Sequence, residues 1–211
     1  MNETLKDNFV KLVSRYTQNS LLINELWNEI EQHYTEPTRH YHNLIHIAAV
    51  YSKLSAIKGL LVDWDTVQFS VFYHDIFYNT NKNDNELNSA LLAKNNLQKL
   101  AIEDSKIVTV FNQILATQSH QNNSDIDTNY FTDADLSILG ESWENYQVYS
   151  KQIRAEYIQY ADDVYIRGRL KVLHHFLEME RIFKTPDFYN FYELKAKQNL
   201  ENEIKLLKQY L

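Results

Sequence analysis

The chain of 211 residues is poor in glycine and proline, with three of the first and two of the second. Tight β-turns depend on these residues and on asparagine–glycine pairs. None of the glycines, Gly59, Gly140 and Gly168, follows an asparagine or aspartate. The shortage argues against a β-rich fold and favours a helical one.

Cysteine is absent altogether. Its absence excludes disulfides, thiolate metal ligands and a cysteine nucleophile. Lysine and arginine number 21 against 28 acidic residues, which gives a formal net charge of −7. Binding to a nucleic-acid backbone draws on clustered basic residues, so we expect no duplex partner. A small anionic substrate is compatible with this charge, because metal ions supply positive charge locally.

Long hydrophobic runs are also missing. No apolar run approaches the roughly 18 residues that span a bilayer. The first residues, Met1 to Thr4, show no basic segment followed by an apolar one, as a signal peptide would. We therefore expect a cytoplasmic protein without a membrane partner, and the sequence does not predict its oligomeric state.

Apolar residues recur at helical spacing along most of the chain, which predicts an all-α bundle of roughly eight to ten helices. The length suits one domain over residues 1–211, with a core at about 39–140 that carries the motifs discussed below and carboxy-terminal helices at about 142–211. One helix is expected from about His42 to Lys58. The segment Asp65 to Gln68 is typical of a capping box, so we expect a second helix to begin there and to end near Phe77. A short helix carrying Asp133 is expected to close at Gly140, and Pro186 is expected to break the chain.

Histidines and acids gather in two segments. His42 and His46 are four residues apart, so both are expected on one helix face. His74-Asp75 closes an apolar stretch, where such a pair is costly unless it is paired or bound to metal. A lone histidine is usually a hydrogen-bonded core or boundary residue, but this combination favours a site. Imidazole and carboxylate ligands together suit Zn, Mn, Fe or Ni.

A later acidic pair, Asp133 and Asp135, offers one more ligand. Thr132 or Asp133 can simply cap a short helix. Asp135 precedes an apolar continuation and is harder to explain as a cap. Which of the two aspartates is a ligand stays open at this point.

The order of these residues resembles the H…HD…D signature of the HD superfamily. Several segments are similar, more narrowly, to the branch described as predicted metal-dependent HD-superfamily phosphohydrolases, and they extend from about residue 39 to 205. These segments are Arg39-x-Tyr41-His42-Asn43-x-x-His46, Phe72-Tyr73-His74-Asp75-x-x-Tyr78, Asp84-Asn85-Glu86-x-x-Ser89-Ala90, Ile114-x-x-Thr117-x-x-His120, Asp133-Ala134-Asp135-Leu136-x-x-Leu139-Gly140, Glu156-Tyr157, Gly168-Arg169 and Ala196-x-x-Asn199-Leu200.

The resemblance implies a divalent metal ion (Mn, Zn, Ni, Fe or Mg) bound by His46, His74, Asp75 and Asp135. Two-metal members carry two further histidines between the HD pair and the last aspartate. Only His120 lies in that interval, so we expect one ion rather than two. The implied activity is hydrolysis of a small phosphate ester, a nucleotide among the candidates, by a metal-activated water.

Glu86, His120 and His42 are the candidate catalytic residues. Glu86 is either a base that orients the attacking water or an acid favoured by the helix dipole in a first turn. His120 and His42 can protonate the leaving oxygen, contact phosphate or bind metal. Candidate phosphate contacts are Arg39, Lys82, Arg154 and Arg169, although surface arginines are usually only solvated.

Three other functions compete with hydrolysis. The chain can bind a nucleotide or another phosphorylated ligand at a metal site without turnover, as a sensor or regulatory module. It can also be a helical interaction protein whose histidines are incidental. A two-iron redox role fits less well, because the set of ligands is short for it.

Overall fold

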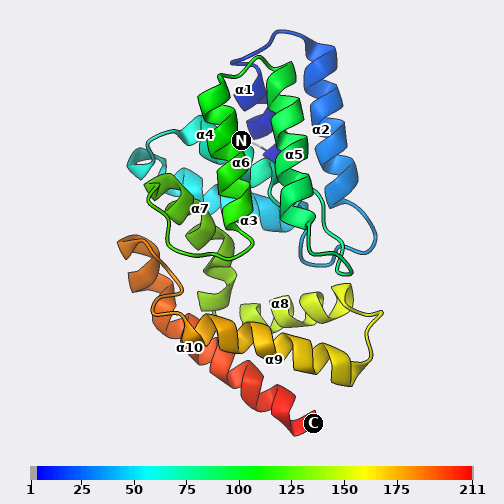
Figure 1. The fold of residues 1–211 in the computed structure, drawn as a ribbon, viewed down its shortest axis with the longest axis vertical. Helices are drawn as coiled ribbons and strands as arrows, with labels where there is room; N and C mark the ends of the chain where they lie inside the picture. The colour runs from blue at the N-terminus through cyan, green and yellow to red at the C-terminus, as the bar shows by residue number, and fades with distance from the viewer. Residues whose placement is uncertain (1–3, 211) are drawn as a thin grey trace. The chain divides into compact units, whose positions relative to one another are not determined.

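The computed structural model describes residues 4–210, which leaves Met1 to Glu3 and Leu211 outside the description. The described residues form ten α-helices and three short 3₁₀ helices, without strands, so the all-α prediction is confirmed (Figure 1). The α-helices are α1 (Leu5–Val13), α2 (Ser20–Tyr34), α3 (Leu44–Ala56), α4 (Trp64–Tyr73), α5 (Asn85–Lys99), α6 (Asp104–Ala116), α7 (Ile126–Leu136), α8 (Trp143–Glu156), α9 (Asp162–Glu178) and α10 (Pro186–Leu207). The 3₁₀ helices are η1 (Lys58–Leu60), η2 (Ser137–Gly140) and η3 (Lys208–Tyr210).

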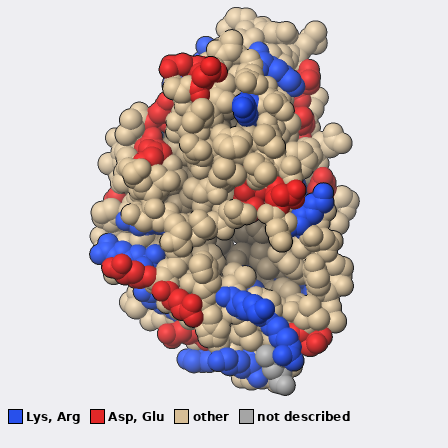
Figure 2. All heavy atoms as spheres, in the orientation of Figure 1, with Lys and Arg blue, Asp and Glu red and all other residues tan. Residues whose placement is uncertain are grey.

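The chain divides into two compact units, Met1–Thr132 and Asp133–Leu211, with the division inside α7. The single HD-type domain expected for residues 1–211 stays a prediction. Among the described residues, no helix is both long and apolar enough to cross a membrane. Acidic and basic side chains lie interspersed on the face drawn in Figure 2.

Helix α4 is the central helix of the first unit. Every residue from Thr66 to Tyr73 is buried. The ring of Phe72 lies 5.0 Å from that of Phe9 on α1, in an edge-to-face contact. Ser70, a polar residue inside this helix, donates to the side-chain oxygen of Gln113 on α6 at 2.6 Å. Burial on all sides explains why this segment is mostly apolar and carries no amphipathic stripe.

Two helices of this unit begin elsewhere than predicted. Helix α3 begins at Leu44, because the side chain of Asn43 accepts from the backbone N–H of Ile45 at 2.8 Å. The expected start at His42 was therefore wrong. Helix α4 has Asp63 as its N-cap, which accepts from the backbone N–H of Thr66 at 3.2 Å.

The expected capping box at Asp65 was also wrong. The carboxylate of Asp65 instead accepts from Arg15 and, at 2.9 Å, from the hydroxyl of Tyr16. Gly59 lies inside η1 rather than at a helix C′ position, since α3 already ends at Ala56.

Helix α7 starts earlier than the short helix expected around Asp133. Asp125 accepts from the backbone N–H of Thr128 at 3.1 Å and so caps a helix that begins at Ile126. Downstream, Pro186 opens α10 instead of breaking the chain, because proline is tolerated at the first position of a helix.

The second unit is held by a buried charge pair between α9 and α10. Arg169 donates to both carboxylate oxygens of Glu203, at 2.9 and 3.0 Å. Tyr146 and Ser150 on α8 donate to the same carboxylate. Burial alone raises the pKa of Glu203, but Arg169 and these hydroxyls outweigh it and hold the pKa below its ordinary value.

Helix α10 also contacts η2 closely. The side-chain amide of Asn199 donates to the carbonyls of Leu139 and Glu141, at 2.8 and 2.9 Å. A Cβ at Gly140 would lie 2.6 Å from the backbone carbonyl of Tyr192, so only glycine fits at this crossing. These contacts give Gly140 and Asn199 a structural role in the second unit.

Substituting Glu203→Gln should lower the free energy of unfolding by about 3–5 kcal/mol, because it leaves the buried guanidinium of Arg169 without a counter-charge. Urea denaturation measures this loss. Glu201→Gln, at an exposed position of the same helix, is the control and should change stability by less than about 0.5 kcal/mol. Equal stability of the two variants would contradict the role of the pair.

Candidate metal centre

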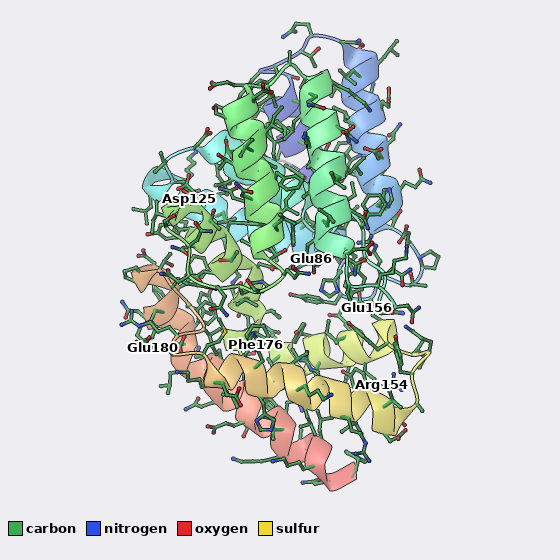
Figure 3. All side chains as sticks on the ribbon, in the orientation of Figure 1. Glu86, Asp125, Arg154, Glu156, Phe176 and Glu180 are labelled. Carbon is green, nitrogen blue, oxygen red and sulfur yellow. The ribbon has the colours of Figure 1, made fainter. Side chains whose placement is uncertain are left out.

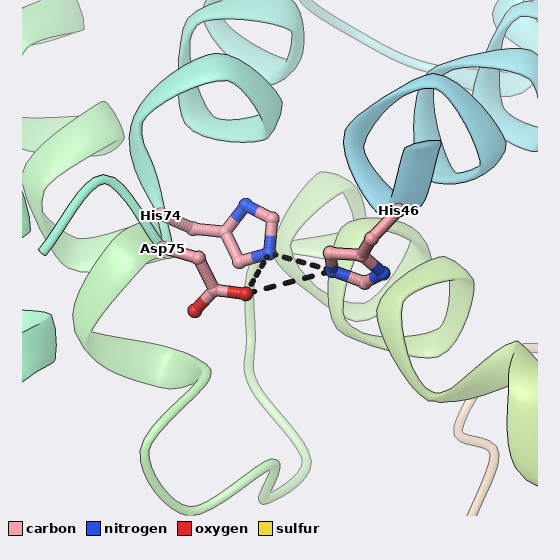
Figure 4. Close-up of side chains that lie close together, drawn as sticks. All are labelled: His46, His74 and Asp75. Carbon is pink, nitrogen blue, oxygen red and sulfur yellow. Dashed lines mark hydrogen bonds and ion pairs between the residues drawn. The ribbon is translucent and has the colours of Figure 1, made fainter. Parts of the chain in front are cut away.

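His46, His74 and Asp75 bring three ligand atoms together in the first unit (Figure 4). The Nε2 atoms of the two histidines are 3.3 Å apart. Asp75 Oδ2 lies 3.1 Å from His74 Nε2 and 3.5 Å from His46 Nε2. In a tetrahedral site with metal–ligand bonds of about 2.0–2.1 Å, ligand atoms lie about 3.3–3.4 Å apart. The observed spacing therefore fits a bound ion.

The hydrogen bonding of His74 defines which of its ring atoms can bind an ion. Nδ1 lies 3.0 Å from the backbone carbonyl of Val71. A carbonyl only accepts, so we assign the hydrogen to Nδ1, and Nε2 of the neutral ring presents a lone pair. Asp75 Oδ2 is also an acceptor, and His46 can donate one hydrogen to only one of them. A shared cation, either a proton or a metal ion, resolves this conflict.

Burial makes that conflict costly. The side chains of His46 and His74 are 3% and 0% exposed, and that of Asp75 is 19% exposed. Burial raises the pKa of Asp75, but His74 and His46 outweigh it and hold the pKa well below its ordinary value. Asp75 is therefore an anion at neutral pH and can serve as a ligand without losing a proton.

The three ligands come from the ends of two helices. His46 lies in the first turn of α3, which Asn43 caps. His74 and Asp75 directly follow α4, which ends at Tyr73 rather than near Phe77 as expected. The hydroxyl of Tyr34 on α2 accepts from the backbone N–H of Asp75 at 3.2 Å. His74 and Asp75 thus follow the buried helix, whereas the sequence placed them within it.

His42 lies just before α3, so the expectation that it shares a helix face with His46 was wrong. The rings of His42 and His46 are nevertheless 5.8 Å apart. His42 stacks on Tyr78 at 4.1 Å, and the ring of Tyr41 lies 4.8 Å from that of His46. Sequence reasoning did not assign these tyrosines a role, although both belong to segments that resemble the HD branch.

The other two catalytic candidates and the phosphate-contact candidate Lys82 lie on or next to α5 and α6 of the first unit. Glu86 is in the first turn of α5 (Figure 3) and is half-buried, which fits an acid favoured by the helix dipole and leaves its role as a base a prediction. His120 follows α6 in a left-handed conformation, with φ of 51°, and its backbone N–H donates to the carbonyl of Ala116. Lys82 is exposed in the loop before α5. The catalytic or phosphate-binding roles of these residues stay predictions.

The three arginine candidates for phosphate contacts have partners within the protein. The guanidinium of Arg39 is buried and donates to backbone carbonyls, including that of Ile76 at 2.7 Å. Arg154, at the end of α8, donates to Asp162 and to the carbonyls of Tyr157 and Tyr160. Arg169 pairs with Glu203. These bonds give the arginines structural roles, and their contact with a phosphate stays a prediction.

The structure distinguishes Asp133 from Asp135. Asp133 is fully buried inside α7, not at its cap, and its carboxylate accepts from the backbone N–H groups of Lys184 and Thr185 and from the hydroxyl of Thr185. Lys184 Nζ lies 3.3 Å from the same carboxylate, an ion pair without hydrogen-bond geometry. With its oxygens occupied, Asp133 is a structural residue. Asp135 stays the predicted ligand of the two.

The sequence matches no family model and no curated protein. The metal-binding capacity of His46, His74 and Asp75 therefore rests on their geometry alone.

Asp133→Asn should reduce the free energy of unfolding by about 3 kcal/mol, because an amide cannot replace the charge next to Lys184 and turns a donor toward N–H groups. Chemical denaturation measures the change. Asp163→Asn, an exposed position in the first turn of α9, serves as the matched control and should stay within about 0.5 kcal/mol of wild type. A similarly small effect at Asp133 would argue against its structural role.

Proposed function

We propose that the protein is a metal-dependent phosphohydrolase of the HD type, with one divalent ion bound by His46, His74 and Asp75. The observation that carries this proposal is the convergence of two imidazole nitrogens and one carboxylate oxygen within 3.1–3.5 Å in a buried setting. The resemblance of the surrounding segments to predicted metal-dependent phosphohydrolases supplies the class of reaction.

The ligand set suits a transition metal with open positions. Two imidazoles and one carboxylate favour Zn, Mn, Fe or Ni over Ca, which prefers oxygen ligands alone. An ion held by three protein groups retains positions for water and for a substrate oxygen. When bound, it lowers the pKa of a water and polarises a phosphoryl oxygen, the chemistry that phosphate-ester hydrolysis needs.

Residues of the chain orient the ligands, supply negative charge beside the ion and provide a proton donor. The carbonyl of Val71 fixes the ring of His74, so that Nε2 faces Asp75. Asp75 contributes one negative charge, which offsets part of the charge of the ion. His42 is half-buried, with its ring close to that of His46, and we propose it as the group that donates a proton to the leaving oxygen.

The substrate in this proposal is a small phosphorylated compound. The carbonyl and carboxylate partners of Arg39, Arg154 and Arg169 leave recognition of the phosphate to the ion and to other side chains. Cytoplasmic location and the absence of nucleic-acid and membrane partners remain expectations from the sequence.

Protein purified without a chelator should contain about one equivalent of a transition metal, measured by elemental analysis. His74→Ala removes a ligand and should weaken binding of that ion by more than about 100-fold, since loss of a residue that merely supports a ligand costs 10–100-fold. His175→Ala, on α9 and exposed, is the histidine control and should retain the metal. Far-UV circular dichroism checks that both variants keep their helices.

Activity of the metal-loaded protein is then measured against a panel of phosphate monoesters and nucleotides, with His74→Ala as the negative control. Turnover that is lost in this variant supports the hydrolase. Thermal stabilisation by a phosphorylated compound without turnover would favour the sensor instead. Wild-type protein without metal, and without stabilisation by added Mn, Zn, Ni, Fe or Mg, would overturn the metal site.

A further inference from the structure

Arg39 lies outside every helix, in the turn that leads into α3, yet its side chain is only 1% exposed. Its guanidinium lies 5.1 Å from the ring centre of Tyr34 and 5.8 Å from that of Tyr78. Among residues 4–210, the carboxylate that pairs with it is that of Glu36, 3.2 Å from Nε, on a side chain that is 42% exposed. A buried charge with one partly solvated counter-ion is costly, so other groups must stabilise it.

Those other groups are backbone carbonyls from two separate segments. Nη1 donates to the carbonyl of His42 at 3.2 Å and to that of Asp75 at 2.5 Å. Nη2 donates to the carbonyl of Ile76 at 2.7 Å. One planar group therefore joins the approach to α3 with the chain that follows α4.

These two segments carry all three ligand atoms of the candidate metal centre. His42 precedes the N-cap of α3, and His46 lies in its first turn. Asp75 is itself a ligand, next to His74. The separation of His46 Nε2 from His74 Nε2 and Asp75 Oδ2 thus depends on how the two segments are held, and the guanidinium of Arg39 contacts the backbone of both.

We propose that Arg39 is a positioning residue of the metal centre, which holds the two ligand-bearing segments at the spacing that an ion requires, and that it does not contact the substrate. This inference rests on the proposed function. An ammonium group cannot replace it, because lysine presents a point charge whereas arginine presents a planar fork that reaches several acceptors at once. Groups that orient metal ligands typically contribute 10–100-fold in affinity.

The test measures binding of Zn²⁺ and of Mn²⁺ alone, without any substrate, by competition with a chromophoric chelator. Arg39→Met should weaken binding by about 10–100-fold, and Arg39→Lys should remain weaker than wild type by about tenfold. A residue that only contacts a phosphate would leave the affinity for the ion unchanged in both variants.

Two controls separate positioning from a general loss of stability. Leu12→Ala removes a buried core side chain of α1 and should destabilise the fold by about 2–5 kcal/mol. Arg15→Met removes the arginine that pairs with Asp65 in the same unit. Both should bind the ion as tightly as wild type, at a temperature where circular dichroism shows each protein folded. If Arg39→Met is unfolded at that temperature, the metal affinity of Arg39→Lys is compared with that of wild type instead.

The outcomes distinguish the two proposals. Wild-type protein that binds neither ion overturns the metal site, and the role of Arg39 with it. Wild-type protein that binds an ion while both Arg39 variants bind it equally tightly leaves the metal site standing and overturns the positioning role. Weakened binding in Leu12→Ala, to the same extent as in Arg39→Met, also overturns it, since stability alone would then explain the loss.

Discussion

The burial of α4 is the constraint on which the first unit depends. Its side chains pack on every side, and the chain that leaves it carries His74 and Asp75 into a buried setting. Polar groups there need partners. The backbone carbonyl of Val71 contacts His74 and the hydroxyl of Tyr34 contacts Asp75, and the ligand atoms of His46, His74 and Asp75 lie close enough together to hold a metal ion. The packing that buries α4 thus also brings these ligand atoms together.

In the second unit, the buried carboxylates are stabilised by hydrogen-bond donors of the protein itself. Asp133 and Glu193 accept from successive backbone N–H groups in the segment between α9 and α10, and Glu203 pairs with Arg169. Each of these carboxylates has enough donors within the protein. Asp133, Arg169 and Asn199 all have their hydrogen-bond partners within the protein, so these residues serve the packing of the second unit.

Much of the helical content follows from local sequence, and helix boundaries follow less well. Periodic apolar residues predict helices along most of the chain, and the scarcity of glycine and proline argues against a β-rich fold. Two aspartates, Asp63 and Asp65, lie near the start of α4, however, and each is a suitable cap. Asp63 takes that position while Asp65 pairs with Arg15, a residue 50 positions away. Contacts at such separation are not visible in a local pattern.

The sequence by itself determined the helical class and the pairing of histidine with aspartate in an apolar stretch, because both depend on residue types and spacings of a few positions. Tertiary structure decided how closely the ligand atoms of His46, His74 and Asp75 approach one another, where the resemblance only named these residues as a set. Tertiary structure decided as well that His42 lies outside the helix. It also decided that Arg39 is buried against carbonyls on both sides of this site. The physical reason is that each of these contacts joins helix ends whose approach depends on how the whole unit packs around α4.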